Sequence, residues 1–187
     1  MIGDGPLGGF RVGGRGVADI RLSADNVRCV LGIGDAPQEM DVGLLLDRLS
    51  VKYGVTYDVL EPNEMPHPDI EACWDPDSIT MYIRSDVFVK ACRDDPRARF
   101  TIMHELGHGL LGHRRTINRS NSERPPKIYE DSEWQANQFA AEFLMPLDVI
   151  QRLGLNTALK LEMHFNVSAA AAMRRVTQLA KRQELPC

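Results

Sequence analysis

Apolar residues are grouped along the chain in patterned stretches that predict helices and strands. Residues 100–112 are apolar or glycine nearly throughout, which is typical of a helix buried on most of its faces. A second helix is expected over residues 132–146, with Ser132 as its N-terminal cap. Three further helices are predicted towards the C-terminus, over residues 146–153, 157–165 and 168–184.

The first half of the chain predicts two helices, over residues 23–31 and 37–53, followed by a small sheet. Its strands are expected at residues 55–60, 71–74 and 79–84. The sequence Asp75-Pro76-Asp77-Ser78 favours a tight turn, so the last two strands should form an antiparallel hairpin. We therefore expect an α+β fold, in which a small antiparallel sheet packs on the central helix pair and a helical subdomain follows.

The length and composition indicate that the chain can bury one sizeable core, since it has 187 residues, of which 43% are hydrophobic. The formal net charge is −4, but residues 151–187 contain six Lys or Arg against two Glu, so the C-terminal part is basic. The four cysteines lack paired spacing, and no stretch has the pattern of a secretion signal or the length of a membrane span. A cytoplasmic protein with reduced thiols is expected.

The apolar stretch at residues 100–112 contains the pattern His-Glu-x-x-His. Residues four apart lie on one face of a helix, so the rings of His104 and His108 can converge on one metal ion. Glu105 points beside that ion, towards the position of a bound water, which suits a general base. The alternative is two core histidines hydrogen-bonded to the backbone. It is less favoured because two imidazoles and a carboxylate would then need partners inside a buried helix.

A catalytic zinc site of this type needs a third protein ligand. A third histidine at the extended spacing is absent, because His113 follows His108 by five positions instead of six. Glu133, near the start of the second central helix, is preferred over Glu130, which precedes that helix, and over Glu142, which faces elsewhere.

Further residues are candidates for supporting roles. Asn137, one turn after Glu133, can accept a hydrogen bond from a ligating histidine, although it can also be an ordinary surface asparagine. Three side chains are candidates for stabilising a transition-state oxyanion, namely His113, Tyr129 and Tyr82. The strand at residues 79–84 is a candidate edge for an extended substrate, and a purely structural hairpin is equally consistent with the pattern.

Two segments together resemble the ImmA/IrrE family of zinc metallopeptidases, which are gluzincin-like enzymes. They are Phe-Thr-Ile-Met-His-Glu-Leu-Gly-His at 100–108 and Glu-x-x-Ala-Asn-x-Phe-Ala-Ala-Glu-Phe-Leu-Met-Pro at 133–146. The resemblance implies that His104, His108 and Glu133 bind Zn²⁺ and that Glu105 is the catalytic acid/base. It also implies a protein substrate, because such proteins cleave or inactivate a helix-turn-helix repressor.

Three parts of the chain are expected. Residues 1–36 open with seven glycines among the first sixteen positions and predict a flexible extension. Residues 37–146 form the zinc metallopeptidase core, and residues 147–187 form a helical, helix-turn-helix-like C-terminal subdomain.

The expected function is hydrolysis of a peptide bond in a repressor-type protein, with no membrane partner. The alternative is a regulatory or toxin-antitoxin-type binding protein that acts without cleavage. It would act on a repressor or on DNA through its C-terminal helices. Direct DNA contact through residues 157–184 is the less favoured interpretation.

Overall fold

The computed structural model describes residues 9–35, 40–114 and 127–186. Within these ranges the chain has an α+β fold with eight α-helices, one short 3-10 helix and a three-stranded sheet, so the expected fold class is confirmed. The helices are α1 (Val17–Leu31), α2 (Val42–Tyr53), α3 (Ser85–Cys92), α4 (Pro96–Leu110), α5 (Ser132–Leu144), α6 (Leu147–Arg152), α7 (Ala158–Phe165) and α8 (Ala169–Lys181), and the 3-10 helix η2 covers Ile128–Glu130. None of the helices in these ranges combines the length and the apolar character that crossing a membrane requires.

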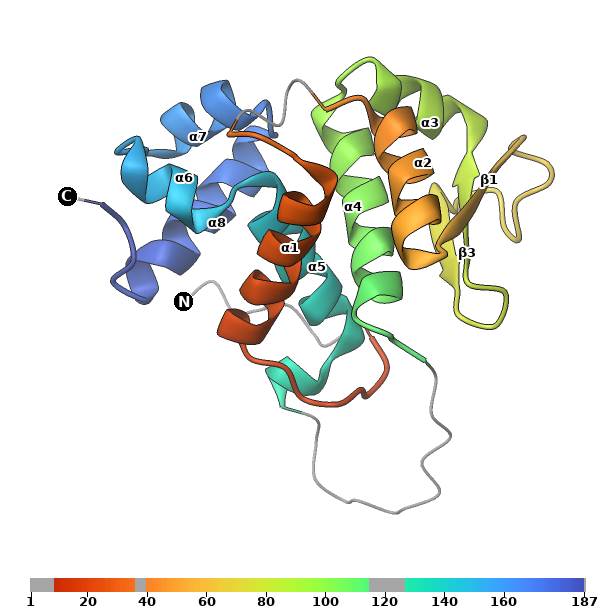
Figure 1. Ribbon diagram of the computed structural model, residues 1–187, viewed down its shortest axis with the longest axis horizontal. Coiled ribbons are helices and arrows are strands. Elements are labelled where there is room, and N and C mark those ends of the chain that lie inside the picture. The colour runs from red at the N-terminus through yellow and green to blue at the C-terminus, as the bar shows by residue number, and fades with distance from the viewer. Residues whose placement is uncertain (1–8, 36–39, 115–126, 187) are drawn as a thin grey trace.

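The central helices α4 and α5 separate two groups of elements (Figure 1). The sheet, α2 and α3 lie on one side, and the C-terminal helices α6, α7 and α8 lie on the other. This arrangement puts the two helices that carry the candidate ligands in the middle of the molecule.

The sheet is mixed, whereas an antiparallel sheet was expected. Its strand order is β1-β3-β2, with β1 (Thr56–Leu60) parallel to β3 (Thr80–Arg84) and β2 (Ala72–Asp75) antiparallel to β3. The predicted hairpin is present, but residues 61–71 first carry the chain from β1 to the far side of β3, and such a crossover makes β1 and β3 parallel. The proposal of a substrate edge at residues 79–84 is therefore wrong, because β3 is central and paired on both sides.

The starts of the two central helices are fixed by aspartate caps. Asp95 accepts a hydrogen bond from the amide of Ala98 at 2.8 Å at the start of α4. Asp131 accepts one from the amide of Trp134 at 2.7 Å, so it caps α5 in place of the expected Ser132. Each carboxylate satisfies an amide that has no partner within its helix.

Residues 17–31 form α1 and are not part of a flexible extension. The helix begins after Gly16, whose amide donates to the Asp19 carboxylate at 3.1 Å, and it buries an apolar face against α5. Ser23, the residue at which this helix was expected to begin, lies inside the helix and donates to the carbonyl of Asp19 at 2.9 Å. Residues 1–8 lie outside the described ranges, and the boundary at residue 147 stays a prediction.

The residues just before α1 are also paired with the body of the protein. The amide of Phe10 donates to the Ser132 hydroxyl at 3.2 Å, and the amide of Val12 donates to the carbonyl of Glu130 at 2.8 Å. Residues 9–16 therefore run beside the start of α5.

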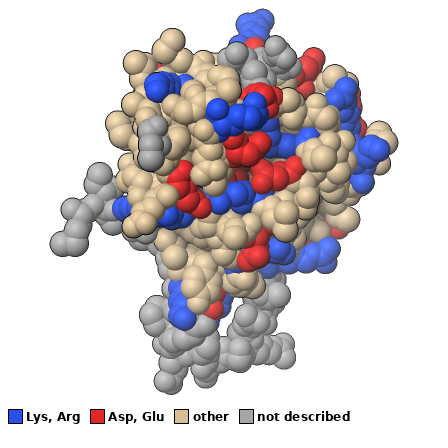
Figure 2. Space-filling view, turned by 60° about the vertical axis from the view of Figure 1, so that its left-hand side comes forward, with Lys and Arg blue, Asp and Glu red and all other residues tan. Residues whose placement is uncertain are grey.

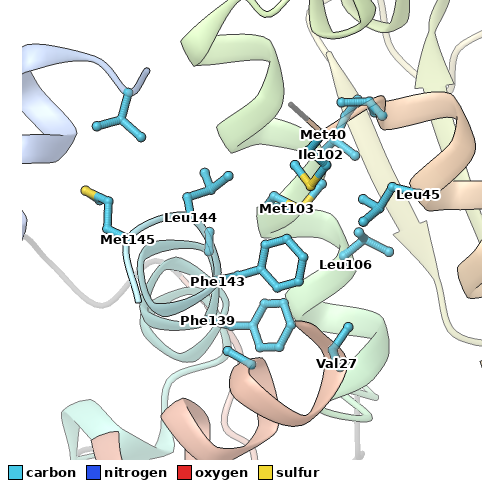
Figure 3. Packing of buried hydrophobic residues seen from close by; sticks show 14 of the residues in the cluster. Val27, Met40, Leu45, Ile102, Met103, Leu106, Phe139, Phe143, Leu144 and Met145 are labelled. Atoms are coloured by element: carbon cyan, nitrogen blue, oxygen red, sulfur yellow. The ribbon is translucent and has the colours of Figure 1, made fainter. Parts of the chain in front are cut away.

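The hydrophobic core lies where α5 faces α4 and α1 (Figure 3). Phe139 and Phe143 stack on each other with ring centroids 5.9 Å apart, and the α4 residues Met103 and Leu106 lie against them. All four side chains are almost completely buried. Burial of side chains of this size stabilises the fold by about 1.5–3 kcal/mol each, so this contact fixes α4 and α5 relative to each other.

A buried ionic cluster holds α5 from the side of α1 and α8. Glu142 is fully buried and accepts a hydrogen bond from Nη1 of Arg175 at 2.8 Å and one from Nε of Arg21 at 3.1 Å. Burial by itself would raise the pKa of Glu142, but the hydrogen bonds and positive charges of Arg175 and Arg21 lower it below its ordinary value. One carboxylate thus joins three helices.

Replacing Glu142 with Gln should destabilise the protein, because Arg175 would then be buried without its counter-charge. We expect the free energy of unfolding near neutral pH to fall by about 3–5 kcal/mol, measured by urea denaturation. Since the folded-state pKa is lowered, the contribution of Glu142 is present above its unfolded-state pKa of about 4.3 and is lost as the pH falls below that value. The two proteins should therefore approach equal stability in acid, and a pH-independent difference would contradict the assignment.

Candidate active site

Two histidines and one glutamate converge between α4 and α5. His104 and His108 lie one turn apart on α4, and their Nε2 atoms are 3.2 Å from each other. Glu133, in the first turn of α5, has one carboxylate oxygen 3.1 Å from Nε2 of His104 and the other 3.2 Å from Nε2 of His108. The candidate ligand atoms lie within 4.8 Å of one another, so these three residues can hold one metal ion.

The donor set fits a divalent metal such as zinc. Imidazole nitrogen and carboxylate oxygen are common zinc ligands, and catalytic zinc sites have three protein ligands and an open position. The nearby imidazoles of His104 and His108 lower the pKa of Glu133, which favours its anionic form. Burial alone would lower the pKa of His104, but the hydrogen bond and charge of Glu133 and the charge of Glu105 raise it. The surroundings therefore favour a positive charge among these atoms.

Glu105 lies beside the three candidate ligands. One of its carboxylate oxygens is 4.0 Å from Nε2 of His104, and the other accepts a hydrogen bond of 3.0 Å from the backbone amide of Trp74 on β2. Burial raises the pKa of Glu105, and the charges of His104 and His108 oppose this shift. A carboxylate with a raised pKa is suited to accepting and releasing a proton near neutral pH.

Trp74 was not recognised from the sequence. Its backbone amide acts at the site, and any residue except proline has one, so the sequence contains no signal for it. The indole ring packs over α4 at Gly109, where an added Cβ would lie 2.9 Å from a ring atom. This contact sets the position of β2, and through it the position of the Glu105 carboxylate.

The distance between the two ligand-bearing helices is set by Gly107. A Cβ at this position would lie 3.1 Å from Cα of Ala136 and 3.2 Å from its carbonyl oxygen on α5. Ala140, one turn further along α5, is also fully buried. The small residues at Gly107 and Ala136 let α5 approach until Glu133 reaches both histidines.

Asn137 lies beside His104. Its side-chain oxygen is 3.3 Å from Nδ1 of His104, and its side-chain nitrogen donates to the carbonyl of Glu133 at 2.8 Å. The second contact orients the amide with its oxygen towards the imidazole. This contact agrees with the role suggested for Asn137, which stays a prediction, and it leaves Nε2 of His104 facing the candidate metal position.

His113 lies behind His108, on the side away from the other two ligands. Its Nδ1 atom is 3.0 Å from Nδ1 of His108, and its Nε2 atom is 2.9 Å from the side-chain oxygen of Gln135. The ring is buried, and burial lowers the pKa of His113 to about 4, so the imidazole is neutral near pH 7. Both nitrogens are engaged here, which does not fit the oxyanion contact expected from the sequence.

The two tyrosines are placed differently from each other. Tyr129, on η2, packs its ring against Gly14 and below the ammonium group of Lys127, which is 5.5 Å from the ring centroid. Tyr82 lies on β3 between Met81 and Ile83, whose side chains are buried in the core. Side chains alternate along a strand, so Tyr82 faces the opposite side of the sheet from α4 and cannot serve as an oxyanion contact.

The site is a group of two histidines and one glutamate that can hold a metal ion. A family model, Peptidase_M78, described as the IrrE N-terminal-like domain, matches residues 70–177. The match covers more than half of the chain, and the chain belongs to this family. The resemblance to the ImmA/IrrE family noted from its two motifs is thereby confirmed.

A solved structure supports the fold assignment. A Mycobacterium tuberculosis transcriptional regulator is similar over 83% of this chain, with a TM-score of 0.53 and 14% sequence identity. At this identity the likeness shows the fold alone. The chain covers 45% of the length of that regulator. No curated protein matches the chain.

Replacing Gly107 with Ala should push α4 and α5 apart, because the new methyl group would meet backbone atoms of Ala136. We expect a loss of about 1–3 kcal/mol in unfolding free energy and weaker zinc binding, measured by denaturation and by competition with a chromophoric chelator. Gly43→Ala on α2 is the control, since its Cβ meets only side-chain atoms, the nearest of them 3.3 Å away. Unchanged zinc affinity in Gly107→Ala would contradict the role of the close approach.

Proposed function

We propose that the chain is a zinc-dependent endopeptidase that hydrolyses a peptide bond in a protein substrate. The observation that carries the proposal is the convergence of His104, His108 and Glu133, with the Glu105 carboxylate beside them. The family match supports a peptidase activity. In this proposal zinc would be held by Nε2 of His104, Nε2 of His108 and the carboxylate of Glu133.

Zinc bound at this position would act as a Lewis acid that lowers the pKa of water and polarises a peptide carbonyl. Glu105 is the proposed general base and general acid of the reaction. Its carboxylate oxygen accepts a proton from the attacking water and passes that proton to the nitrogen of the leaving amine. The hydrogen bond from the Trp74 amide holds the other carboxylate oxygen, so the proton-carrying oxygen keeps its orientation.

The substrate can be oriented by the edge of the sheet next to the site. β2 is an edge strand, and Trp74 on this strand contacts both Glu105 and α4. An extended peptide that adds to a free strand edge gains main-chain hydrogen bonds, with little dependence on its sequence. We therefore assign the substrate-binding edge to β2, in place of the central strand β3.

The proposed substrate is a helix-turn-helix repressor. This follows from the resemblance to the ImmA/IrrE family, and the likeness of the fold to a protein described as a transcriptional regulator is in keeping with it. The alternative of DNA binding through the C-terminal helices receives less support. Arg175 is buried against Glu142, and Arg152 pairs with Asp35. Acidic and basic side chains are interspersed over the face seen in Figure 2, without a continuous basic stripe.

Glu105→Gln should separate metal binding from catalysis. The three proposed ligands remain, so zinc content measured by atomic absorption should stay equal to that of the unchanged protein. The rate of peptide cleavage should fall by about 10²–10⁴-fold, because the amide cannot carry the proton. His108→Ala should lose zinc and cleavage together.

The assay incubates the zinc-loaded protein with a helix-turn-helix repressor and identifies fragments by mass spectrometry. Casein serves as a general substrate in parallel, so failure on the repressor alone would reject the substrate and not the chemistry. A Glu105→Gln protein that cuts at the normal rate would refute the role of Glu105. Zinc binding with no cleavage of either substrate would favour the non-proteolytic alternative.

A further inference from the structure

A chain of side-chain hydrogen bonds runs from the candidate ligand His108 into the N-terminal segment. It passes from Nδ1 of His108 to Nδ1 of His113, at 3.0 Å, and from Nε2 of His113 to the side-chain oxygen of Gln135, at 2.9 Å. The Gln135 side-chain nitrogen completes it, with contacts of 2.8 Å to the carbonyl of Gly13 and 2.7 Å to the carbonyl of Tyr129. His113 and Gln135 are both buried, so water does not compete for these contacts.

The direction of each hydrogen bond in this series is determined by the backbone carbonyls of Gly13 and Tyr129, at which the series ends. Backbone carbonyls only accept, so the Gln135 amide must turn its NH₂ group towards Gly13 and Tyr129. Its oxygen then faces His113 and can only accept, which requires a proton on Nε2 of His113. A neutral imidazole with its proton on Nε2 has a lone pair on Nδ1. The contact with His108 is satisfied only if Nδ1 of His108 donates.

We propose that His113 and Gln135 are positioning residues that hold His108 with its proton on Nδ1, so that the Nε2 lone pair faces Glu133 and His104. The proposal rests on the assignment of His108 as a metal ligand. Without this constraint His108 could carry its proton on Nε2 and donate it to Glu133, which is 3.2 Å away, and the lone pair needed for metal would be lost. Loss of an outer partner of a ligating histidine weakens metal binding by about 10–100-fold.

The two candidate histidine ligands are oriented by different means. Asn137 faces His104 directly and is fixed by the carbonyl of Glu133 within the same helix. His108 instead depends on a second imidazole and on the carbonyl of Gly13, far away in the sequence. The N-terminal segment thereby contributes to the orientation of a ligand on α4.

Two substitutions of nearly equal shape separate hydrogen bonding from packing at His113. In His113→Asn, the side-chain oxygen takes the place of Nδ1 and can still accept from His108, whereas His113→Leu has no acceptor there. Long-range ¹H–¹⁵N correlation spectra of the full-length, metal-free protein report directly which nitrogen of His108 carries a proton. His108→Gln identifies the signals. Zinc affinity is then measured for each protein by chelator competition.

The unchanged protein and His113→Asn are expected to keep the Nδ1 proton of His108 and to bind zinc within a few-fold of each other. His113→Leu is expected to lose that proton signal and to bind zinc about 10–100-fold more weakly. The proposal is overturned if the Nδ1 proton is absent from the unchanged protein, or if the Leu and Asn variants behave alike.

Gln135→Met gives a second measurement should His113→Leu fail to fold. It removes the amide that orients His113 and should weaken the Nδ1 proton signal of His108 and zinc binding. Gln138→Met is the matched control, since Gln138 is equally buried on the same helix but bonds to Glu142. These readouts need no peptidase activity. A protein that shows the expected protonation pattern but cuts no substrate would reject the proposed function and leave this inference standing.

Discussion

The close approach of α4 and α5 at Gly107 and Ala136 is the contact on which the rest of the molecule depends. Two histidines on one helix can meet a carboxylate on another only if the two helices pack closely against each other. Gly107 provides the space, because any side chain there would meet backbone atoms of Ala136. The stacked rings of Phe139 and Phe143 fill the interface further along α5, so the same packing that forms the core also brings Glu133 to the histidines.

The helix α5 is held from several directions. Its start is capped by Asp131 and flanked by the N-terminal segment, its middle packs on α4, and its end carries Glu142 in a buried cluster with Arg175 and Arg21. Removing either partner of a buried pair leaves a charge without compensation, so this cluster disfavours rotation of α5 about its axis. A rigid α5 keeps Glu133, Gln135 and Asn137 in fixed positions towards α4.

Much of the site followed from local spacing in the sequence. The four-residue interval between His104 and His108 fixes their common face once the stretch is helical, and an apolar stretch of that length favours a helix. Glu133 and Asn137 follow by the same interval on α5. The start of α1 was predicted too late in the sequence, because the glycines before it indicated a flexible segment. The hydrogen bond from the Gly16 amide to the Asp19 carboxylate, which marks the true start, gives only a weak local signal in the sequence.

The sequence by itself predicted the residues that we propose carry the chemistry, and it determined the α+β class and most of the helices, because these depend on residue type and on periods of a few positions. The tertiary structure decided which strand lies at the sheet edge, why His113 lies on the Nδ1 side of His108, and how Trp74, Gln135 and Gly13 reach the site. These features depend on backbone groups and on contacts between residues far apart in the chain. A backbone amide or carbonyl is present at nearly every position, so its role is defined only by where folding puts it.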